Sequence, residues 1–132
     1  MFFAAGHNQI DGQETGSERN EYDAAGDACR AVWLRQPQTD LGKRYAVLAE
    51  GFYSAYNDKN VYSKAATLAD EMLEIMPVDG LLDSITWQGV AQWRRGSEWA
   101  KANATSLRMI SKGLPADRVR LRQIHYWIAQ SY

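Results

Sequence analysis

The strongest constraint on the fold is a pattern that recurs after 40 residues. Three residue types return at the same offsets, first as Tyr22, Ala25 and Pro37 and then as Tyr62, Ala65 and Pro77. In each segment, small and apolar residues recur every three or four positions, which places them on one face of a helix. The proline ends each helix, because the residue before a proline avoids the helical backbone conformation. The pattern therefore predicts two equivalent amphipathic helices.

Apolar periodicity, capping residues and turn residues together predict an all-α chain. About six helices are expected, at residues 21–35, 40–57, 61–76, 80–95, 98–112 and 116–130. No segment shows the alternation of period two that predicts a strand. Residues 1–20 are expected to be irregular, because glycines and polar residues dominate them, and a helical repeat domain is expected over residues 21–132. In the fifth helix, the residues expected to face the core are Ala100, Ala104, Leu107, Met109 and Ile110.

The three prolines of the chain give the repeat a length. Pro37, Pro77 and Pro115 are spaced by 40 and 38 residues, and each ends a predicted pair of helices. A period of this size with two helices is typical of a helical solenoid, in which stacked hairpins bury apolar stripes that one hairpin cannot bury alone. We therefore expect a short α-solenoid of stacked antiparallel helix-turn-helix pairs. A compact six-helix bundle without a repeat is the alternative.

The unit at residues 46–79 resembles a tetratricopeptide repeat. The similarity depends on five positions of that family's pattern: Phe52, Tyr56, Tyr62, Ala65 and Pro77. Tyr53 departs from the pattern, which has a small residue there. More degenerate copies extend the resemblance over about residues 21–132. The resemblance implies a protein that acts as a scaffold, without catalysis and without a cofactor.

In that family, the first helices of successive pairs line a groove that holds a peptide or a partner helix. The resemblance places the following residues in such a groove: Glu50, Ser54, Asn57, Gln88, Gln92, Arg95, Arg122 and Tyr126. Amides and arginines there could bind an extended backbone or a carboxylate. The alternative is that these residues form the solvated faces of surface helices.

Charge and hydropathy narrow the class of partner. Fifteen basic and sixteen acidic residues give a formal net charge of −1, which argues against a dedicated nucleic-acid surface. Two local basic clusters are expected to dock acidic protein segments: Arg94, Arg95 and Lys101, and then Arg118, Arg120 and Arg122. No apolar run reaches the length that spans a bilayer. We expect no membrane partner and, by default, a cytoplasmic location.

The chain has five tryptophans, which do not all fit one apolar stripe: Trp33, Trp87, Trp93, Trp99 and Trp127. Core packing at helix ends is one explanation. The other is an exposed aromatic patch that anchors a partner or a second copy of the chain. A helical bundle that self-associates through its tryptophans is therefore a further hypothesis.

A rival interpretation comes from the first residues. An apolar start that leads into Gly6-His7, with Glu21 fourteen positions after the histidine, resembles the opening of zinc-dependent N-acetylmuramoyl-alanine amidases. That resemblance implies zinc bound by His7 and Glu21, and a metal-activated water that cleaves an amide. The second histidine of the chain, His125, lies in a predicted helix, and no later strands are predicted. The single cysteine, Cys29, lies on the apolar face of the first helix, where a small buried residue is expected.

Overall fold

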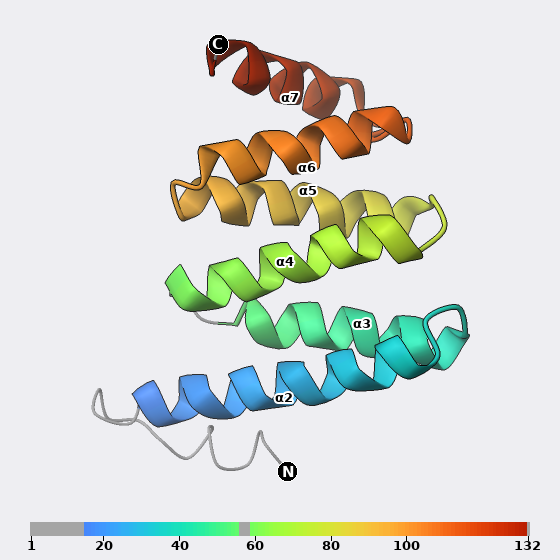
Figure 1. The fold of residues 1–132 in the computed structure, drawn as a ribbon, viewed down its shortest axis with the longest axis vertical. Coiled ribbons are helices and arrows are strands. Elements are labelled where there is room, and N and C mark those ends of the chain that lie inside the picture. Colours follow the sequence, from blue (N-terminus) through green and yellow to red (C-terminus); the bar gives the residue numbers. More distant parts are fainter. Residues whose placement is uncertain (1–14, 56–58, 132) are drawn as a thin grey trace. The chain divides into compact units, whose positions relative to one another are not determined.

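The structure, a computed structural model, describes residues 15–55 and 59–131, and helices are its only regular elements there. The helices are α2 (Thr15–Arg35), α3 (Asp40–Tyr53), α4 (Lys59–Ile75), α5 (Gly80–Arg95), α6 (Trp99–Ser111) and α7 (Arg118–Gln130) (Figure 1). This confirms the prediction of an all-α chain with six helices. The described residues contain no strand, as the absence of period-two alternation predicted.

The first helix begins earlier than predicted. It starts at Thr15, so the expectation of an irregular segment through residue 20 is wrong for residues 15–20. Asn20, the residue before the predicted start, therefore lies inside the helix. No glycine or proline interrupts the chain after Gly16 for nine residues, and this sequence is compatible with an earlier helix start.

The ends of α3 and α5 show how local capping decides a boundary. At α3, Ser54 is the C-cap, so this helix ends before the predicted residue 57. The prediction for α5 is correct at both ends, because the carboxylate of Asp79 accepts a hydrogen bond of 2.9 Å from the backbone N–H of Leu82. Gly96 then ends the helix as its C-cap.

The chain divides into two compact units, residues 1–61 and residues 62–132. In the first unit, α2 and α3 form an antiparallel hairpin. Gly26 lies so close to the Tyr53 ring that a Cβ there would overlap it. The Tyr53 hydroxyl donates a hydrogen bond of 2.6 Å to Asp27. Tyr53, which departs from the tetratricopeptide pattern, is therefore accommodated by a glycine on the facing helix.

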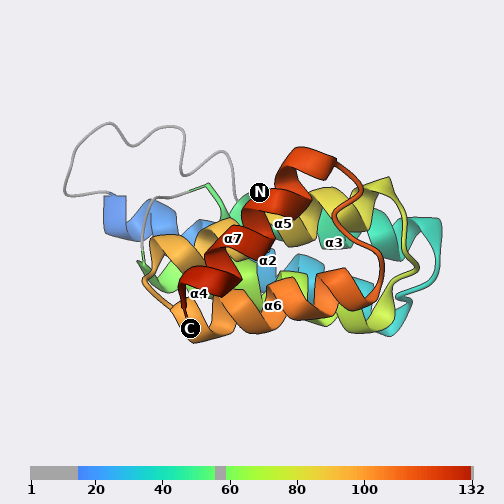
Figure 2. The same cartoon turned by 90° about the horizontal axis from the view of Figure 1, so that it is seen from above.

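The second unit contains α4 from Tyr62 onward, together with α5, α6 and α7. Helices α4 and α5 approach closely, because a Cβ at Gly89 would lie 2.5 Å from the methyl carbon of Ala69. Helices α5 and α6 are packed against each other (Figure 1). Helix α7 contacts α6 and runs obliquely to it (Figure 2). Asp117 caps α7 by accepting hydrogen bonds from two backbone N–H groups.

A cluster around Asp70 ties α4, α5 and α6 together. We call Asp70, Glu74, Trp93, Thr105 and Arg108 the Asp70 cluster. One carboxylate oxygen of Asp70 accepts a hydrogen bond of 2.6 Å from the Thr105 hydroxyl and lies 2.7 Å from an Arg108 guanidinium nitrogen. The other accepts a bond of 3.3 Å from the Trp93 indole N–H. Glu74 lies 3.3 Å from the second guanidinium nitrogen of Arg108. Each polar group at this junction therefore has a partner.

Candidate functional site

The predicted groove residues of α3 and α5 have different surroundings. At the end of α3, the Ser54 hydroxyl donates a hydrogen bond of 2.8 Å to the Glu50 carboxylate. Asn57 lies outside the described residues. On α5, Gln88 is exposed. Gln92 is only 6% exposed, so the prediction that it contacts a partner is wrong. It lies on the side of α5 that packs into the protein, which the groove register did not anticipate.

The other predicted groove residues are exposed arginines and a tyrosine. The Arg95 guanidinium lies over the Tyr62 ring, with its carbon 5.0 Å from the ring centre. Arg122 and Tyr126 lie on one face of α7, where they line a shallow hollow of about 370 Å³ with Val119 and Gln123. The structure therefore brings Arg122 and Tyr126 together. It does not by itself assign a role to either.

The rival zinc site falls largely outside the described residues. His7 is not among them, and Glu21 lies on α2. Within residues 15–55 and 59–131, no three His, Cys, Asp or Glu residues are grouped so that they could hold a metal ion. Cys29 is half-buried, and burial raises the pKa of its thiol. The thiol form is therefore favoured over the nucleophilic thiolate.

The five tryptophans divide into three environments. Trp33 and Trp93 belong to the core, with 0% and 4% of their surface exposed. Trp87 and Trp127 are half-buried. Trp99 is 50% exposed at the start of α6. Core packing therefore accounts for Trp33 and Trp93, and the other three tryptophans lie at or near the surface.

The surface tryptophans and two arginines form what we call the tryptophan–arginine stack, made of Trp87, Arg94, Trp99, Arg120 and Trp127. The guanidinium carbon of Arg94 lies 3.9 Å from the Trp127 ring centre and 5.1 Å from that of Trp99. The rings of Trp87 and Trp127 are stacked, with centres 5.7 Å apart and planes inclined by 19°. Arg120 lies over Trp87 at 5.0 Å. The stack thereby joins the two basic clusters that the sequence indicated.

The turn between α5 and α6 places Arg94 beside Trp99. Arg94 is in the last turn of α5, where the helix dipole favours a positive charge. Ser97 has a φ of 60°, and the Glu98 backbone N–H donates a hydrogen bond of 2.8 Å to the Trp93 carbonyl. This tight reversal lets α6 begin at Trp99. Trp127 comes from α7, so three helices of the second unit build the stack.

The guanidinium edges of the stack are uncommitted. Among the described residues, no carboxylate pairs with Arg94 or Arg120, and neither side chain donates a hydrogen bond. Partial burial lowers the pKa of Arg94, although a guanidinium remains charged at physiological pH. The stack therefore presents planar cations whose faces contact indoles and whose N–H donors can bind an anion.

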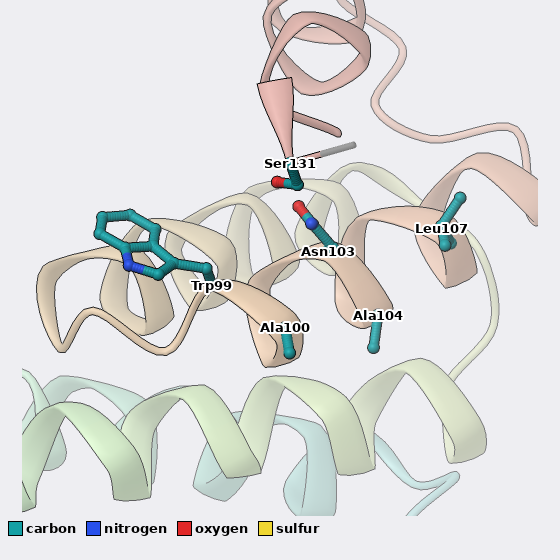
Figure 3. A pocket seen from close by; sticks show the side chains of 6 residues that line it. All are labelled: Trp99, Ala100, Asn103, Ala104, Leu107 and Ser131. Carbon is teal, nitrogen blue, oxygen red and sulfur yellow. The ribbon is translucent and has the colours of Figure 1, made fainter. Parts of the chain in front are cut away.

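A hollow of about 430 Å³ lies along α6 (Figure 3). It is lined by Trp99, Ala100, Asn103, Ala104, Leu107 and Ser131. Trp99 and Leu107 bound it at two ends, with the alanines between them along the helix (Figure 3). Leu107 is 49% exposed. Trp99 belongs both to this hollow and to the stack.

The expected orientation of α6 is wrong, and this is why the sequence did not reveal the hollow. Ala100, Ala104 and Leu107 were expected to face the core, but all three are exposed. Met109 is buried as expected, and the buried face consists of Ala102, Thr105, Ser106 and Met109. Two of those are polar residues whose hydroxyls are satisfied internally, Thr105 by Asp70 and Ser106 by the Ala102 carbonyl at 2.8 Å. Their polarity hid the true core face.

Comparisons with known proteins leave the assignment to the geometry. No protein-family model matches the chain, and no curated protein or solved structure shows significant similarity to it. None of the helices in the described ranges is both long enough and apolar enough to cross a membrane.

Proposed function

We propose that this chain is a non-enzymatic protein-interaction module, and that the hollow beside α6 binds a segment of a partner protein. The observation that carries this proposal is the exposed apolar face of α6, with Trp99 and Leu107 each about half exposed around a concave surface. Single exposed apolar side chains are common, but grouped ones are typical of binding surfaces. Tryptophan is also enriched among the residues that dominate binding energy.

The lining of the hollow favours a helix or an extended segment with apolar side chains. Ala100 and Ala104 allow a partner backbone to approach, while the larger side chains of Trp99 and Leu107 bound the contact. Asn103 and Ser131 offer an amide and a hydroxyl at the edge, next to each other in Figure 3. A volume of about 430 Å³ holds a few side chains. An amphipathic helix with apolar residues one turn apart matches this requirement.

The proposed surface differs from the groove that the tetratricopeptide resemblance implied. The predicted groove residues that the structure describes lie on α3 or its C-cap, on α5 and on α7, whereas the hollow is formed by α6 and Ser131 after α7. Partner binding is common to both hypotheses, but the residues are different. Variants can therefore separate them, because Tyr126 belongs to the predicted groove and Leu107 to the hollow.

Peptide selection on the immobilised protein tests the proposal. Random peptides of about 16 residues, a little over four helical turns, are displayed on phage, and those that bind are enriched over successive rounds. We expect enriched peptides to lose roughly tenfold or more in affinity for Leu107→Ser. Leu41→Ser is the matched control, because Leu41 is also 49% exposed but lies on α3. We expect it to bind these peptides like the unmodified protein.

Three outcomes would overturn the proposal. The first is that no peptide is enriched, and the second is that the enriched peptides bind Leu107→Ser normally. In this second case, peptides that bind Leu107→Ser normally but lose affinity for Tyr126→Ala would indicate binding in the predicted groove. The third is a dimer in sedimentation that Leu107→Ser converts to a monomer, because the occupant would then be a second copy of this chain. Thermal unfolding followed by circular dichroism verifies that each variant is folded.

A further inference from the structure

We propose that Arg94 is the carboxylate-binding residue of this surface, and that the bound segment carries an Asp or Glu side chain next to its apolar anchor. This inference rests on the proposed function, since it specifies the chemistry of the partner segment. Trp99 links the two parts of the surface, because it lines the hollow and also lies 5.1 Å from the Arg94 guanidinium carbon. A segment that fills the hollow at Trp99 therefore comes close to Arg94.

The N–H groups of the Arg94 side chain have no acceptor among the described residues. A guanidinium has five N–H donors in a plane and accepts no hydrogen bonds. The faces of the Arg94 guanidinium contact the rings of Trp127 and Trp99. None of its N–H groups donates a hydrogen bond to a residue in the described part of the chain. The nearby Glu98 forms its ion pair with Lys101, at 3.9 Å. A carboxylate from a partner can pair with two parallel N–H groups of such a guanidinium.

The tryptophan–arginine stack also holds Arg94 in place before a ligand binds. A free arginine side chain loses rotamer entropy when it is fixed. The two indoles already restrict Arg94, and Trp127 is itself stacked on Trp87. Much of the ordering has therefore taken place before a ligand arrives, which favours affinity. Lysine could not replace arginine here, because it lacks the planar group that stacks and forms paired hydrogen bonds.

The second unit also has a local excess of positive charge around Arg94. Within the described residues, five arginines of the second unit have no carboxylate partner: Arg94, Arg95, Arg118, Arg120 and Arg122. The carboxylates nearest them in sequence are engaged elsewhere, with Glu98 on Lys101 and Asp117 on the start of α7. A local excess of positive charge attracts an acidic segment and speeds its association.

The same contacts favour an acidic peptide over single-stranded nucleic acid. A nucleic-acid stacking platform offers free aromatic faces to successive bases. Here the rings of Trp87 and Trp127 are stacked on each other, and each also carries an arginine. The net charge of the whole chain is −1, which is unlike the strongly basic balance of a domain that follows a phosphate backbone.

The experiment uses the peptides selected on the unmodified protein, synthesised with amidated C-termini so that only side chains supply carboxylates. We expect the enriched peptides to contain Asp or Glu beside their apolar residues. Replacing that acid by its amide and making Arg94→Gln should each weaken binding about tenfold or more. Combining the two should add little, because both remove the same contact. Arg94→Lys should recover only part of the affinity. Arg44→Gln is the control, because Arg44 is an exposed arginine of α3, and we expect less than about a threefold change.

The outcomes separate this inference from the proposed function. Peptides that lack acids and bind Arg94→Gln normally, but still fail to bind Leu107→Ser, would overturn the role of Arg94 and leave the hollow in place. Peptides insensitive to Leu107→Ser would overturn the proposed function itself. A single-stranded oligonucleotide that binds more tightly than the peptides, and loses affinity with Arg94→Gln, would replace the acidic peptide as the ligand.

Discussion

Trp93 and Arg94 are neighbours on α5, yet they belong to clusters with opposite properties. Trp93 faces inward and donates its indole N–H to Asp70, where Thr105 and Arg108 also bind. Arg94 faces the tryptophan–arginine stack, where its contacts are with ring faces and its N–H donors have no acceptor among the described residues. The Asp70 cluster therefore pairs its charged groups internally, whereas no carboxylate among the described residues pairs with Arg94.

This difference separates a structural role from a binding role. A carboxylate in a partly buried position is stable only when hydrogen bonds and opposite charge compensate for lost hydration. Asp70 receives this compensation from side chains of α5 and α6. Removing Asp70 leaves those side chains without their partner and lowers stability. Arg94 contacts rings at the surface, where a cation–π contact contributes only about 0.5–1 kcal/mol. Its remaining interactions are therefore available to a ligand.

The largest expected effect is on stability at the Asp70 cluster. Asp70→Ala should lower the free energy of unfolding by about 3 kcal/mol, because the indole N–H of Trp93 loses its acceptor and Arg108 loses the nearer of its two carboxylate partners. Denaturant titration followed by circular dichroism measures the change. Glu74→Gln is the control, since the Glu74 side chain is 69% exposed and should contribute less than about 0.5 kcal/mol. Equal losses in the two variants would show that the cluster is not a structural junction.

The next largest effect is expected in the first unit, where the Tyr53 hydroxyl donates a hydrogen bond to the Asp27 carboxylate. Tyr53→Phe should lower the free energy of unfolding by about 1.5 kcal/mol. Burial and the hydrogen bond to Asp27 raise the pKa of Tyr53 above its usual value. Above about pH 10, the unfolded chain therefore releases this proton while the folded chain keeps it, so stability falls as pH rises.

Denaturant titrations near pH 8 and near pH 11 test this pH dependence. Tyr53→Phe should lose less stability over this interval than the unmodified chain, because the other six tyrosines are common to both. If the two proteins lost equal stability, Tyr53 would not be the group responsible.

Much of the fold was predictable because local chemistry determines it. Asp79 and Gly96 set both ends of α5, and the prolines mark where α2 and α4 end. The start of α2 was missed because glycines earlier in the chain suggested a loop, although residues 15–20 are helical. The likeness to tetratricopeptide repeats stays a prediction. The helices of its best unit, α3 and α4, belong largely to different compact units.

The candidate site was only partly predictable, because its contacts join distant residues. The sequence indicated two basic clusters and an acidic partner. It could not reveal that Trp127 on α7 lies over Arg94 on α5. The apolar face of α6 was identified and assigned to the core. The true core face depends on Asp70, which satisfies Thr105 from another helix. Apolar periodicity cannot reveal a hydrogen bond between two helices, because it considers the residues of one helix at a time.

The smallest expected effect on stability, and the sharpest test of the comparison, is at Arg94. Arg94→Gln should lower the free energy of unfolding by about 1 kcal/mol, because it removes two surface ring contacts that contribute about 0.5 kcal/mol each. Its consequence should instead be in binding. Raising salt from about 0.05 M to about 0.5 M shortens the screening length to roughly 4 Å, so an acidic selected peptide should lose affinity severalfold for the unmodified protein. For Arg94→Gln, fluorescence anisotropy should give a weaker and flatter salt dependence. A variant as destabilised as Asp70→Ala, or one with unchanged salt dependence, would mean that the stack is structural like the Asp70 cluster.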